Sequence, residues 1–527
     1  MKKIIRNLFC MAVVTVLFFS TNSTALKTTQ EKNNLDNQFT NTNFLYNETE
    51  DLDPLVDLVI TITIKEIRAF DRIDLLNDPD FYVKLIVNDQ SYSSNVWHDQ
   101  KVVYDQWQET INVPDEKEYV NITIKLWDWN IGIDTLCDIA KNDNDNPDRY
   151  DITVHYSLKT GHWFGDDSNE GPESPWQPDY SGYGRANGCD DNSIYENDKD
   201  CEIWFDITQN DYDGDGIPYW TEVNVYGTDP TVDDRGRDDD GDLVPIEWEF
   251  KWGYRYRPYY HGYIEQEWLY DPFTYNNHSE LDPDSDSLNN VEEYLTSEWG
   301  SDPFRKDIFV ELDQMAAGPN GEAASILPEG AKELLFKAFN RQNIVFHLDD
   351  GRWEDSKSDI IPFDELTEGD RYAPKNELIE IYEQYFLNNS NSNWRAGVFH
   401  YGVVLYQCDI AKGNAFRSNS FQISSKGMKL KTKNLFTGNR DIVYATSYMH
   451  ELGHTLNLNY LLGHSPDATH PWQPLWWKAR PYKSIMNYGY MYGIIFKNFC
   501  DYSNGQHGKN DFDDWSNIDF SYFDQFK

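Results

Sequence analysis

Strict alternation of apolar and polar residues marks the first ordered part of the chain. The run LVITITIKEI, which begins at Leu58, has a period of two, and similar runs follow in DFYVKLIVND (80–89), VNITIKLWDW (120–129) and DITVHYSL (151–158). Because successive side chains of a strand point to opposite faces, these runs predict strands with one buried face. We therefore expect a β-sandwich over residues 55–165.

The C-terminal half of the chain combines buried strands with amphipathic helices. Strands are expected at 306–315, 343–349 and 397–406, and helices at 328–341, at 377–387 and from Asp441 onward, where the Asp would cap the helix. This order predicts an α+β domain over residues 305–527. Residues 166–205 are rich in Gly, Pro, Asp and Asn, and so they predict a linker or a long loop.

Composition indicates a globular and strongly acidic protein. The 527 residues, of which 39% are hydrophobic, suffice for several cores, and the formal net charge is −45. A field of this sign repels polyanions. The composition therefore argues against a nucleic-acid partner and favours divalent cations as counterions.

The N-terminal end has the features of a secretory signal. Lys2, Lys3 and Arg6 precede an apolar run over 8–19, and small or hydroxylated residues follow it. Residues 1–25 are therefore predicted to be a signal peptide. We expect the protein to be secreted or associated with the cell surface.

Five cysteines follow the predicted signal peptide. In an oxidising compartment, Cys189 and Cys201, which flank one polar loop, are a candidate pair, and Cys408 with Cys500 is another. The spacing alone leaves the pairing open.

Three segments between the predicted domains carry acidic residues at a repeated spacing. Each has Asp at positions 1, 3 and 5 of a twelve-residue loop and Glu at position 12, which is the oxygen spacing of a calcium loop. The predicted ligands are Asp211, Asp213, Asp215 and Glu222 in the first loop, Asp238, Asp240, Asp242 and Glu249 in the second, and Asp282, Asp284, Asp286 and Glu293 in the third. Leu243 and Ser287 replace the Gly expected at position 6, so the second and third turns are expected to be distorted.

These loops resemble thrombospondin type 3 or dockerin-like calcium repeats. A Gly-Thr-Asp-Pro turn follows the first loop at 227–230, and Gly-Ser-Asp-Pro follows the third at 300–303. The resemblance implies that residues 206–304 bind Ca²⁺ and form a structural spacer that becomes ordered only with the ion.

Acidic residues also fall in two loops of the predicted sandwich. Asp74 and Asp80 lie in one loop, and Asp128, Asn130 and Asp134 lie in another. Together with the phrases DPDFYVKL and LWDWN, this arrangement resembles a C2 domain, whose calcium ions lie between two such loops. The resemblance implies a C2-like module that docks to a surface or membrane. Asn130 stands where an Asp is usual and reduces the charge of this site.

The predicted helix that follows Asp441 carries the sequence His450-Glu451-Leu452-Gly453-His454. Positions i and i+4 lie on one face of a helix, so the two His can hold one Zn²⁺ while Glu451 reaches a metal-bound water. This spacing predicts zinc-dependent hydrolysis. A solvated or capping His pair is the alternative for so short a motif.

The segment Lys483-Ser484-Ile485-Met486-Asn487-Tyr488 adds a second motif. With the His pair, it resembles the metzincin clan of zinc peptidases, in which a methionine turn lies beneath the zinc. The resemblance implies that Met486 is that methionine and that Tyr488 ligates zinc or stabilises the tetrahedral intermediate. It also implies peptide hydrolysis with Glu451 as the base.

The third zinc ligand departs from the metzincin pattern. Asn457 and Tyr460 stand where the clan has Gly and His. Asn457 can still adopt the left-handed conformation and turn the chain back over the metal. Of the downstream candidates His464, Asp467 and His470, we favour Asp467, because a Ser-Pro kink precedes it, and His464 is the main alternative.

Together, these features predict a secreted, calcium-stabilised zinc endopeptidase that acts on a protein or peptide substrate. Zn²⁺ and Ca²⁺ are the predicted cofactors. The alternative is a calcium-dependent surface-binding or adhesion protein with an inactive peptidase domain. The missing third His favours this alternative, and the retained Glu451 argues against it.

Overall fold

The computed structural model describes residues 54–74, 77–140, 150–167, 179–180, 184–189, 199–258, 264–353, 355–369, 376–390, 393–432, 440–491 and 500–522. The predicted signal peptide lies outside these residues. Within them, no helix is both long and apolar enough to cross a membrane.

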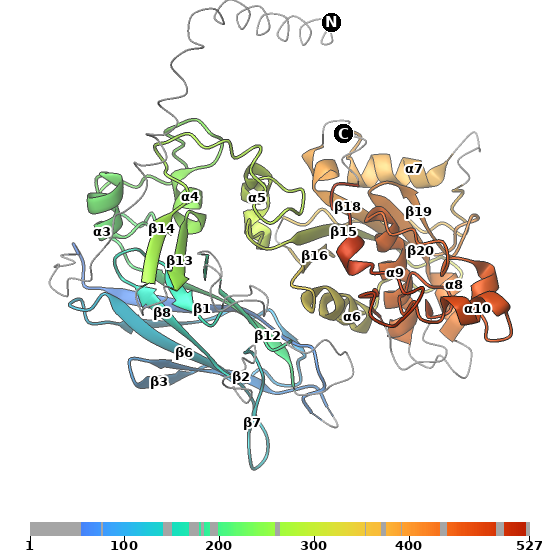
Figure 1. Ribbon diagram of the computed structural model, residues 1–527, viewed down its shortest axis with the longest axis horizontal. Coiled ribbons are helices and arrows are strands. Elements are labelled where there is room, and N and C mark those ends of the chain that lie inside the picture. The colour runs from blue at the N-terminus through green and yellow to red at the C-terminus, as the bar shows by residue number, and fades with distance from the viewer. Residues whose placement is uncertain are drawn as a thin grey trace, which may run out of the picture. The chain divides into compact units, whose positions relative to one another are not determined.

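Two antiparallel sheets form an N-terminal β-sandwich (Figure 1). The strands of the first sheet are β1 (Val59–Ala69), β4 (Val102–Val103), β5 (Trp107–Asn112), β11 (Gly184–Asn187) and β12 (Cys201–Gln209). Those of the second are β2 (Phe81–Val87), β3 (Gln90–Ser93), β6 (Tyr119–Asp128), β7 (Thr135–Leu136), β8 (Ile152–Ser157) and β9 (Trp163–Gly165). Alternate residues of both sheets, such as Ile60 and Ile62 in β1 and Val83 and Leu85 in β2, share one core. The predicted strands and the β-sandwich are therefore confirmed.

The sandwich extends past its predicted end. β12 pairs with β1 from Ile60↔Gln209 to Ala69↔Cys201, and β11 pairs with β12. Both strands begin within the range 166–205, so the linker prediction was wrong for these segments. The apolar residues of β11 and β12 form only short runs within acidic sequence. Ala186, Ile203 and Phe205 are nevertheless buried in the sandwich core.

Short helices and a small sheet make up the acidic middle segment of the chain. They are α3 (Tyr219–Thr221), a π-helical turn (Glu222–Tyr226), α4 (Ile246–Trp252), α5 (Asn290–Thr296) and a 3-10 turn (Ser297–Trp299), with β10 (Asp179–Tyr180), β13 (Tyr254–Pro258) and β14 (Ile264–Trp268). Each predicted calcium loop runs into one of these helices, which carries its position-12 Glu. Trp248, Trp252 and Tyr270 form part of a small core beneath the second loop.

A mixed sheet forms the centre of the C-terminal domain (Figure 1). Its order is β16-β15-β18-β20-β19, with β17 paired to β15, and every pairing is parallel except that of β19 with β20. The strands are β15 (Asp307–Met315), β16 (Val345–Asp349), β17 (Ile360–Ile361), β18 (Phe399–Leu405), β19 (Gly413–Arg417) and β20 (Ser420–Ser424).

Helices cover this sheet, and one of them carries the predicted zinc motif His450–His454. They are α6 (Glu329–Asn340), α7 (Glu377–Ile381) with a π-helical turn (Tyr382–Phe386), a 3-10 turn (Trp394–Gly397), α8 (Ser425–Thr432), α9 (Arg440–Thr455), α10 (Pro474–Ala479) and 3-10 turns at Pro466–Ala468 and Trp515–Asn517. Helix α9 packs on β18, β19 and β20, and α6 packs on β16 and α9. The strands and helices predicted for this half are all present.

The cysteines do not pair as predicted. All five in the described part of the chain are free and buried. Cys201 points into the sandwich core, where its thiol hydrogen-bonds Cys137. Cys500 packs on Met449, with 3.7 Å between the sulfur atoms. Neither Cys189 with Cys201 nor Cys408 with Cys500 forms a disulfide.

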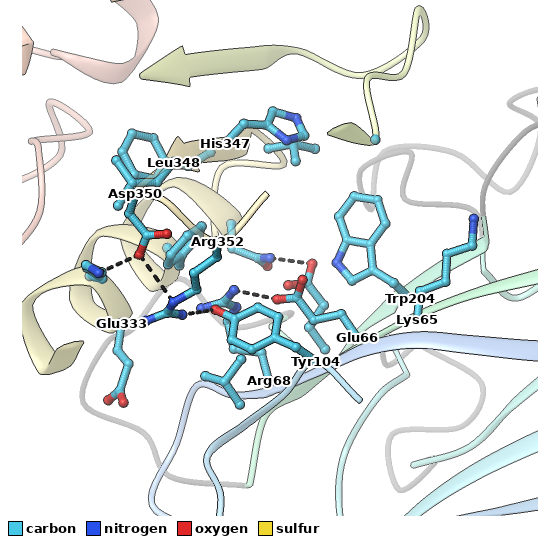
Figure 2. Close-up of a pocket in the computed structure, with 18 of the residues that line it drawn as sticks. Lys65, Glu66, Arg68, Tyr104, Trp204, Glu333, His347, Leu348, Asp350 and Arg352 are labelled. Carbon is cyan, nitrogen blue, oxygen red and sulfur yellow. Dashed lines mark hydrogen bonds and ion pairs between the residues drawn. The ribbon is translucent and has the colours of Figure 1, made fainter. Parts of the chain in front are cut away.

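A cavity of about 770 Å³ lies between β1 of the sandwich and the α6–β16 region of the C-terminal domain (Figure 2). Its walls carry charges of both signs that pair with one another, as in Arg68 with Glu66 and Arg352 with Glu329. Beside it, Lys337 donates to Asp71 at 2.7 Å. None of His450, His454 and His464 lines this cavity, and its charged walls form a polar junction between the sandwich and the C-terminal domain.

Candidate functional site

Helix α9 holds the zinc motif within the core of the C-terminal domain. The helix is buried from Ile442 to Gly453, because one face packs on the sheet and the C-terminal segment covers another. Beyond the helix, Asn457 has a φ of 62°, and the N–H of Leu458 donates to the carbonyl of Gly453 at 2.8 Å. The left-handed turn predicted at Asn457 is confirmed, and it reverses the chain.

The returning chain brings His464 to the His pair. His450, His454 and His464 each offer a ring nitrogen, and these atoms lie within 4.8 Å of one another. Nε2 of His450 and Nε2 of His464 are 3.0 Å apart. The structure therefore brings the alternative third ligand to the site.

Asp467, the favoured third ligand in the sequence, lies apart from this cluster. It is exposed in the 3-10 turn Pro466–Ala468, where its N–H donates to Oγ of Ser465 at 3.3 Å. The Ser-Pro kink thus starts a turn that presents Asp467 to solvent, and His464, not the favoured Asp467, groups with the His pair. His470 is also exposed, and it stacks on Trp472.

Close packing against the methionine turn sets the position of His464. A Cβ at Gly463 would lie 2.7 Å from the ring of Tyr482 and 2.9 Å from Cβ of Asn487, so only Gly fits there. The N–H of Tyr488 also donates to the carbonyl of Gly463 at 3.0 Å. A Gly directly before a His was the one sequence signal that could have favoured His464.

The hydrogen bonds of the His pair fix which nitrogen atoms face the cluster. Nδ1 of His450 lies 2.8 Å from the carbonyl oxygen of Ile485, and Nδ1 of His454 lies 3.1 Å from that of Leu458. A carbonyl can only accept, so Nδ1 carries the proton in each ring and Nε2 keeps its lone pair. Burial lowers the pKa of all three His, that of His464 to about 4, so the rings are neutral at pH 7. This donor set fits Zn²⁺.

Tyr488 lies against the His cluster, and Met486 lies against the helix that carries the His pair. Met486 is buried beneath α9, where a Cβ at Gly453 would be only 2.7 Å from its sulfur. The ring centroid of Tyr488 lies 4.5 Å from that of His464 and 5.6 Å from that of His450. Burial, and then the charge of Glu451, raises the pKa of Tyr488, so its hydroxyl remains a donor.

Glu451 lies on the same helix as His450 and His454, and its side chain contacts the terminal strand of the sheet. The N–H of Ala415 in β19 hydrogen-bonds the Glu451 carboxylate, and a Cβ at Gly413 would lie 2.5 Å from its Oε1. Burial raises the pKa of Glu451 to about 8. A dication beside it would favour the ionised form, which is the form that can accept a proton.

The three acidic loops share one backbone geometry. In each loop, the N–H of position 6 donates to the carboxylate of position 1, at 3.0 to 3.2 Å. The φ of position 6 is 93° at Gly216, 86° at Leu243 and 75° at Ser287. The predicted distortion is therefore absent. Leu243 and Ser287 adopt the left-handed conformation in place of Gly, which is strained for a Leu above all.

Residues outside the twelve-residue pattern complete each loop. The N–H groups of Asp234, Asn276 and Asp307 donate to the position-5 Asp of the first, second and third loops, at 3.3, 3.2 and 2.7 Å. The carboxylate of Asp234 joins the acidic cluster of the first loop, and the imidazole of His278 joins that of the second. These residues were missed because nothing in their local sequence marks them.

Many carboxylate oxygens of the loops are buried without a hydrogen-bond partner. They include Oδ2 of the position-3 residues Asp213, Asp240 and Asp284 and oxygens of Glu249 and Glu293. Burial and then repulsion among the carboxylates raise the pKa of Glu222 to about 8 and that of Glu249 to about 9. Converging oxygens of this kind fit a divalent cation such as Ca²⁺.

The two acidic loops of the sandwich meet as predicted. The N–H of Asp80 donates to Asp128 at 2.8 Å, and burial together with the charge of Asp128 raises the pKa of Asp74. The side chain of Asn130 donates to Asp128 at 2.7 Å, and its N–H donates to Asp134 at 3.1 Å. Asn130 thus occupies oxygens that a cation would need, so this set offers fewer open ligands than the middle loops.

No family of known sequences and no curated protein matches the chain. Among solved structures, the chain is similar to a C2 domain at 11% identity and a TM-score of 0.17, over 29% of this chain and 98% of that one. It is similar to a C2 domain of plant extended synaptotagmin 1 at 9% identity and a TM-score of 0.16, over 29% of this chain and 94% of that one. It is similar to human GIVD cytosolic phospholipase A2 at 12% identity and a TM-score of 0.16, over 29% of this chain and 16% of that one.

Proposed function

We propose that the protein is an exported, calcium-stabilised zinc endopeptidase of the metzincin-like type. The observation that carries the proposal is the grouping of three neutral imidazoles beside a buried helix that also carries Glu451 and packs on Met486. His450, His454 and His464 would hold the zinc, which supplies Lewis-acid polarisation of the scissile carbonyl and lowers the pKa of a bound water.

The residues around the zinc ligands have separate roles in the proposed reaction. Glu451 accepts a proton from the attacking water and returns it to the leaving amine. Tyr488 donates its hydroxyl hydrogen to the developing oxyanion, because its raised pKa keeps it protonated. β19 is the terminal strand of the sheet and contacts Glu451, so an extended peptide added to this strand would pass the base.

Casein hydrolysis by the zinc-loaded chain tests the proposed activity. Cleavage that a zinc chelator abolishes supports a peptidase. A chain with zinc at this site and no cleavage of casein or denatured proteins would instead favour the calcium-dependent surface-binding protein with an inactive peptidase domain.

We propose that the middle segment, 206–304, binds Ca²⁺ and depends on it for stability. Without a cation, the raised pKa values of Glu222 and Glu249 mean that the folded chain binds more protons than the unfolded chain. Removing calcium is therefore expected to make stability fall as the pH rises from about 4.3, the unfolded value for Glu, through about 8 to 9. With Ca²⁺ bound, this fall should be absent.

Thermal unfolding between about pH 5 and 9, with and without a calcium chelator, measures this difference. Limited proteolysis at neutral pH provides a second readout, since cuts in the chelated protein should fall within 206–304. An identical pH profile in calcium and in chelator would contradict the proposal.

The sandwich has a candidate docking surface at the tip of the β6–β7 loop. Ile131 is 97% exposed and Ile133 is 88% exposed, and both flank the acidic residues of the predicted C2-like site. We propose that this tip inserts into a lipid surface. Ile131→Asp with Ile133→Asp is expected to weaken binding to mixed neutral and anionic vesicles at least about tenfold, because burial of one Ile side chain contributes about 1.5–3 kcal/mol.

Vesicle co-sedimentation in calcium measures this binding. Ile360→Asp is a matched control, because Ile360 is also exposed but lies in β17 of the C-terminal domain. Equal loss in both variants, or no loss in the loop variant, would contradict docking through this tip.

A further inference from the structure

We propose that His278, together with Asp242 and Glu249 of the second acidic loop, makes that loop a site for a borderline divalent ion such as Zn²⁺ in preference to Ca²⁺. This inference changes the ion of the second loop alone, leaves Ca²⁺ in the first and third loops, and is independent of the proposed peptidase activity.

The three side chains converge in a buried space. Nε2 of His278 lies 3.2 Å from Oδ2 of Asp242 and 3.7 Å from Oε1 of Glu249. His278 is fully buried, Glu249 is 1% exposed, and Asp242 is 2% exposed. Nε2 of His278 and Oε1 of Glu249 have no hydrogen-bond partner. Buried polar atoms without partners are rare, and here they point to a ligand that would satisfy both at once.

The three loops provide an internal comparison for the donor atoms. In each, a residue from a later segment donates its N–H to the position-5 Asp. In the first and third loops this residue is Asp234 or Asp307, and it adds a buried carboxylate to the cluster. In the second loop it is Asn276, and the added donor is the imidazole of His278, two residues later.

An imidazole in place of a carboxylate changes the kind of ion that the second loop prefers. Ca²⁺ takes oxygen ligands almost exclusively, whereas Zn²⁺ and its transition-metal neighbours bind imidazole well. Zinc in proteins binds both imidazole nitrogen and carboxylate oxygen, and three protein ligands leave one position open. The second loop thus has the backbone of its neighbours and a different donor chemistry.

The surroundings hold the imidazole in place. Its ring packs edge-to-face against Tyr270 at 4.8 Å and Trp248 at 5.5 Å. The side-chain amide of Asn290 contacts Nδ1 at 2.8 Å, and its Oδ1 has no partner. With the amide turned by 180°, Oδ1 accepts from Nδ1–H, and Nε2 then presents its lone pair to the two carboxylates.

Metal content of the full-length protein tests this site. We would use the His464→Asn variant, which removes a ligand of the other candidate zinc site, and dialyse it against micromolar Zn²⁺ with millimolar Ca²⁺. One bound Zn²⁺ per chain is expected to remain. His278→Gln in this background is expected to abolish it, and X-ray absorption at the zinc edge should report a single imidazole ligand.

His278→Asp and Asp234→Asn serve as matched variants in the same background. His278→Asp gives the second loop the oxygen donors of its neighbours, so zinc should be exchanged for one additional Ca²⁺. Asp234→Asn should lower calcium binding and leave zinc unchanged. Far-UV circular dichroism verifies folding of each variant. Zinc that persists in both His278 variants, or a His464→Asn protein that binds only Ca²⁺, would overturn the proposal, whether or not the wild type cleaves casein.

Discussion

Glu451→Gln is expected to lower kcat for casein hydrolysis by about 10²- to 10⁴-fold, the usual contribution of a general base. The amide has nearly the shape of the carboxylate but cannot accept the proton of the attacking water. Because Glu451 is not one of the clustered imidazoles, the variant should keep its zinc. Initial rates together with zinc content by atomic absorption measure both quantities.

Glu383→Gln is a suitable control for this variant. Glu383 lies in the π-helical turn after α7, and its side chain is half exposed. It should leave rate and zinc content unchanged. A Glu451→Gln protein with wild-type activity would exclude Glu451 as the base.

His464→Asn is expected to weaken zinc binding, and Asp467→Asn is expected to leave it unchanged. Loss of His464 removes one of three ligands, so zinc affinity should fall by at least about 100-fold, since loss of an outer hydrogen-bond partner alone costs about 10- to 100-fold. Asp467 is exposed in its turn, and its replacement should leave affinity and activity intact. Because the second acidic loop is proposed to hold zinc as well, both variants are made in the His278→Gln background, and competition with a chromophoric zinc chelator measures their affinities.

These two variants distinguish His464, which the structure places beside the His pair, from Asp467, which the sequence favoured. Zinc retained by His464→Asn and lost by Asp467→Asn would mean that the Ser-Pro kink does direct the Asp inward. Loss in neither variant would point to a ligand outside the described residues.

Local pattern was enough to predict most of the C-terminal domain. The period of the apolar residues predicted β15, α6 and β18, and the His spacing predicted that two imidazoles share one face of α9. Local pattern could not decide which downstream residue joins the two His, because His464 and Asp467 lie three residues apart on the same returning segment. Their placement depends on packing of Gly463 against Tyr482, which is a tertiary contact.

In the acidic loops, too, sequence spacing predicted the local residues but not those that arrive through tertiary contacts. Their position-1, 3, 5 and 12 carboxylates follow from spacing, whereas Asp234, His278 and Asp307 reach the loops from segments further along the chain. The expectation that position 6 needs a Gly was also wrong at Leu243. This residue adopts a strained, positive φ, and its N–H donates to Asp238 as in the other loops. β12 was missed because acidic residues around it obscure a buried strand.

The junction between the third acidic loop and the sheet of the C-terminal domain has a thermodynamic consequence. The N–H of Asp307, the first residue of β15, donates to Asp286 of that loop at 2.7 Å. If the third loop binds Ca²⁺ as proposed, an ion that binds only the native chain would stabilise it by mass action, so the fraction of chains with an assembled sheet would rise with ambient calcium. Where calcium is scarce, as inside a cell, fewer chains would hold this sheet than in a calcium-rich medium.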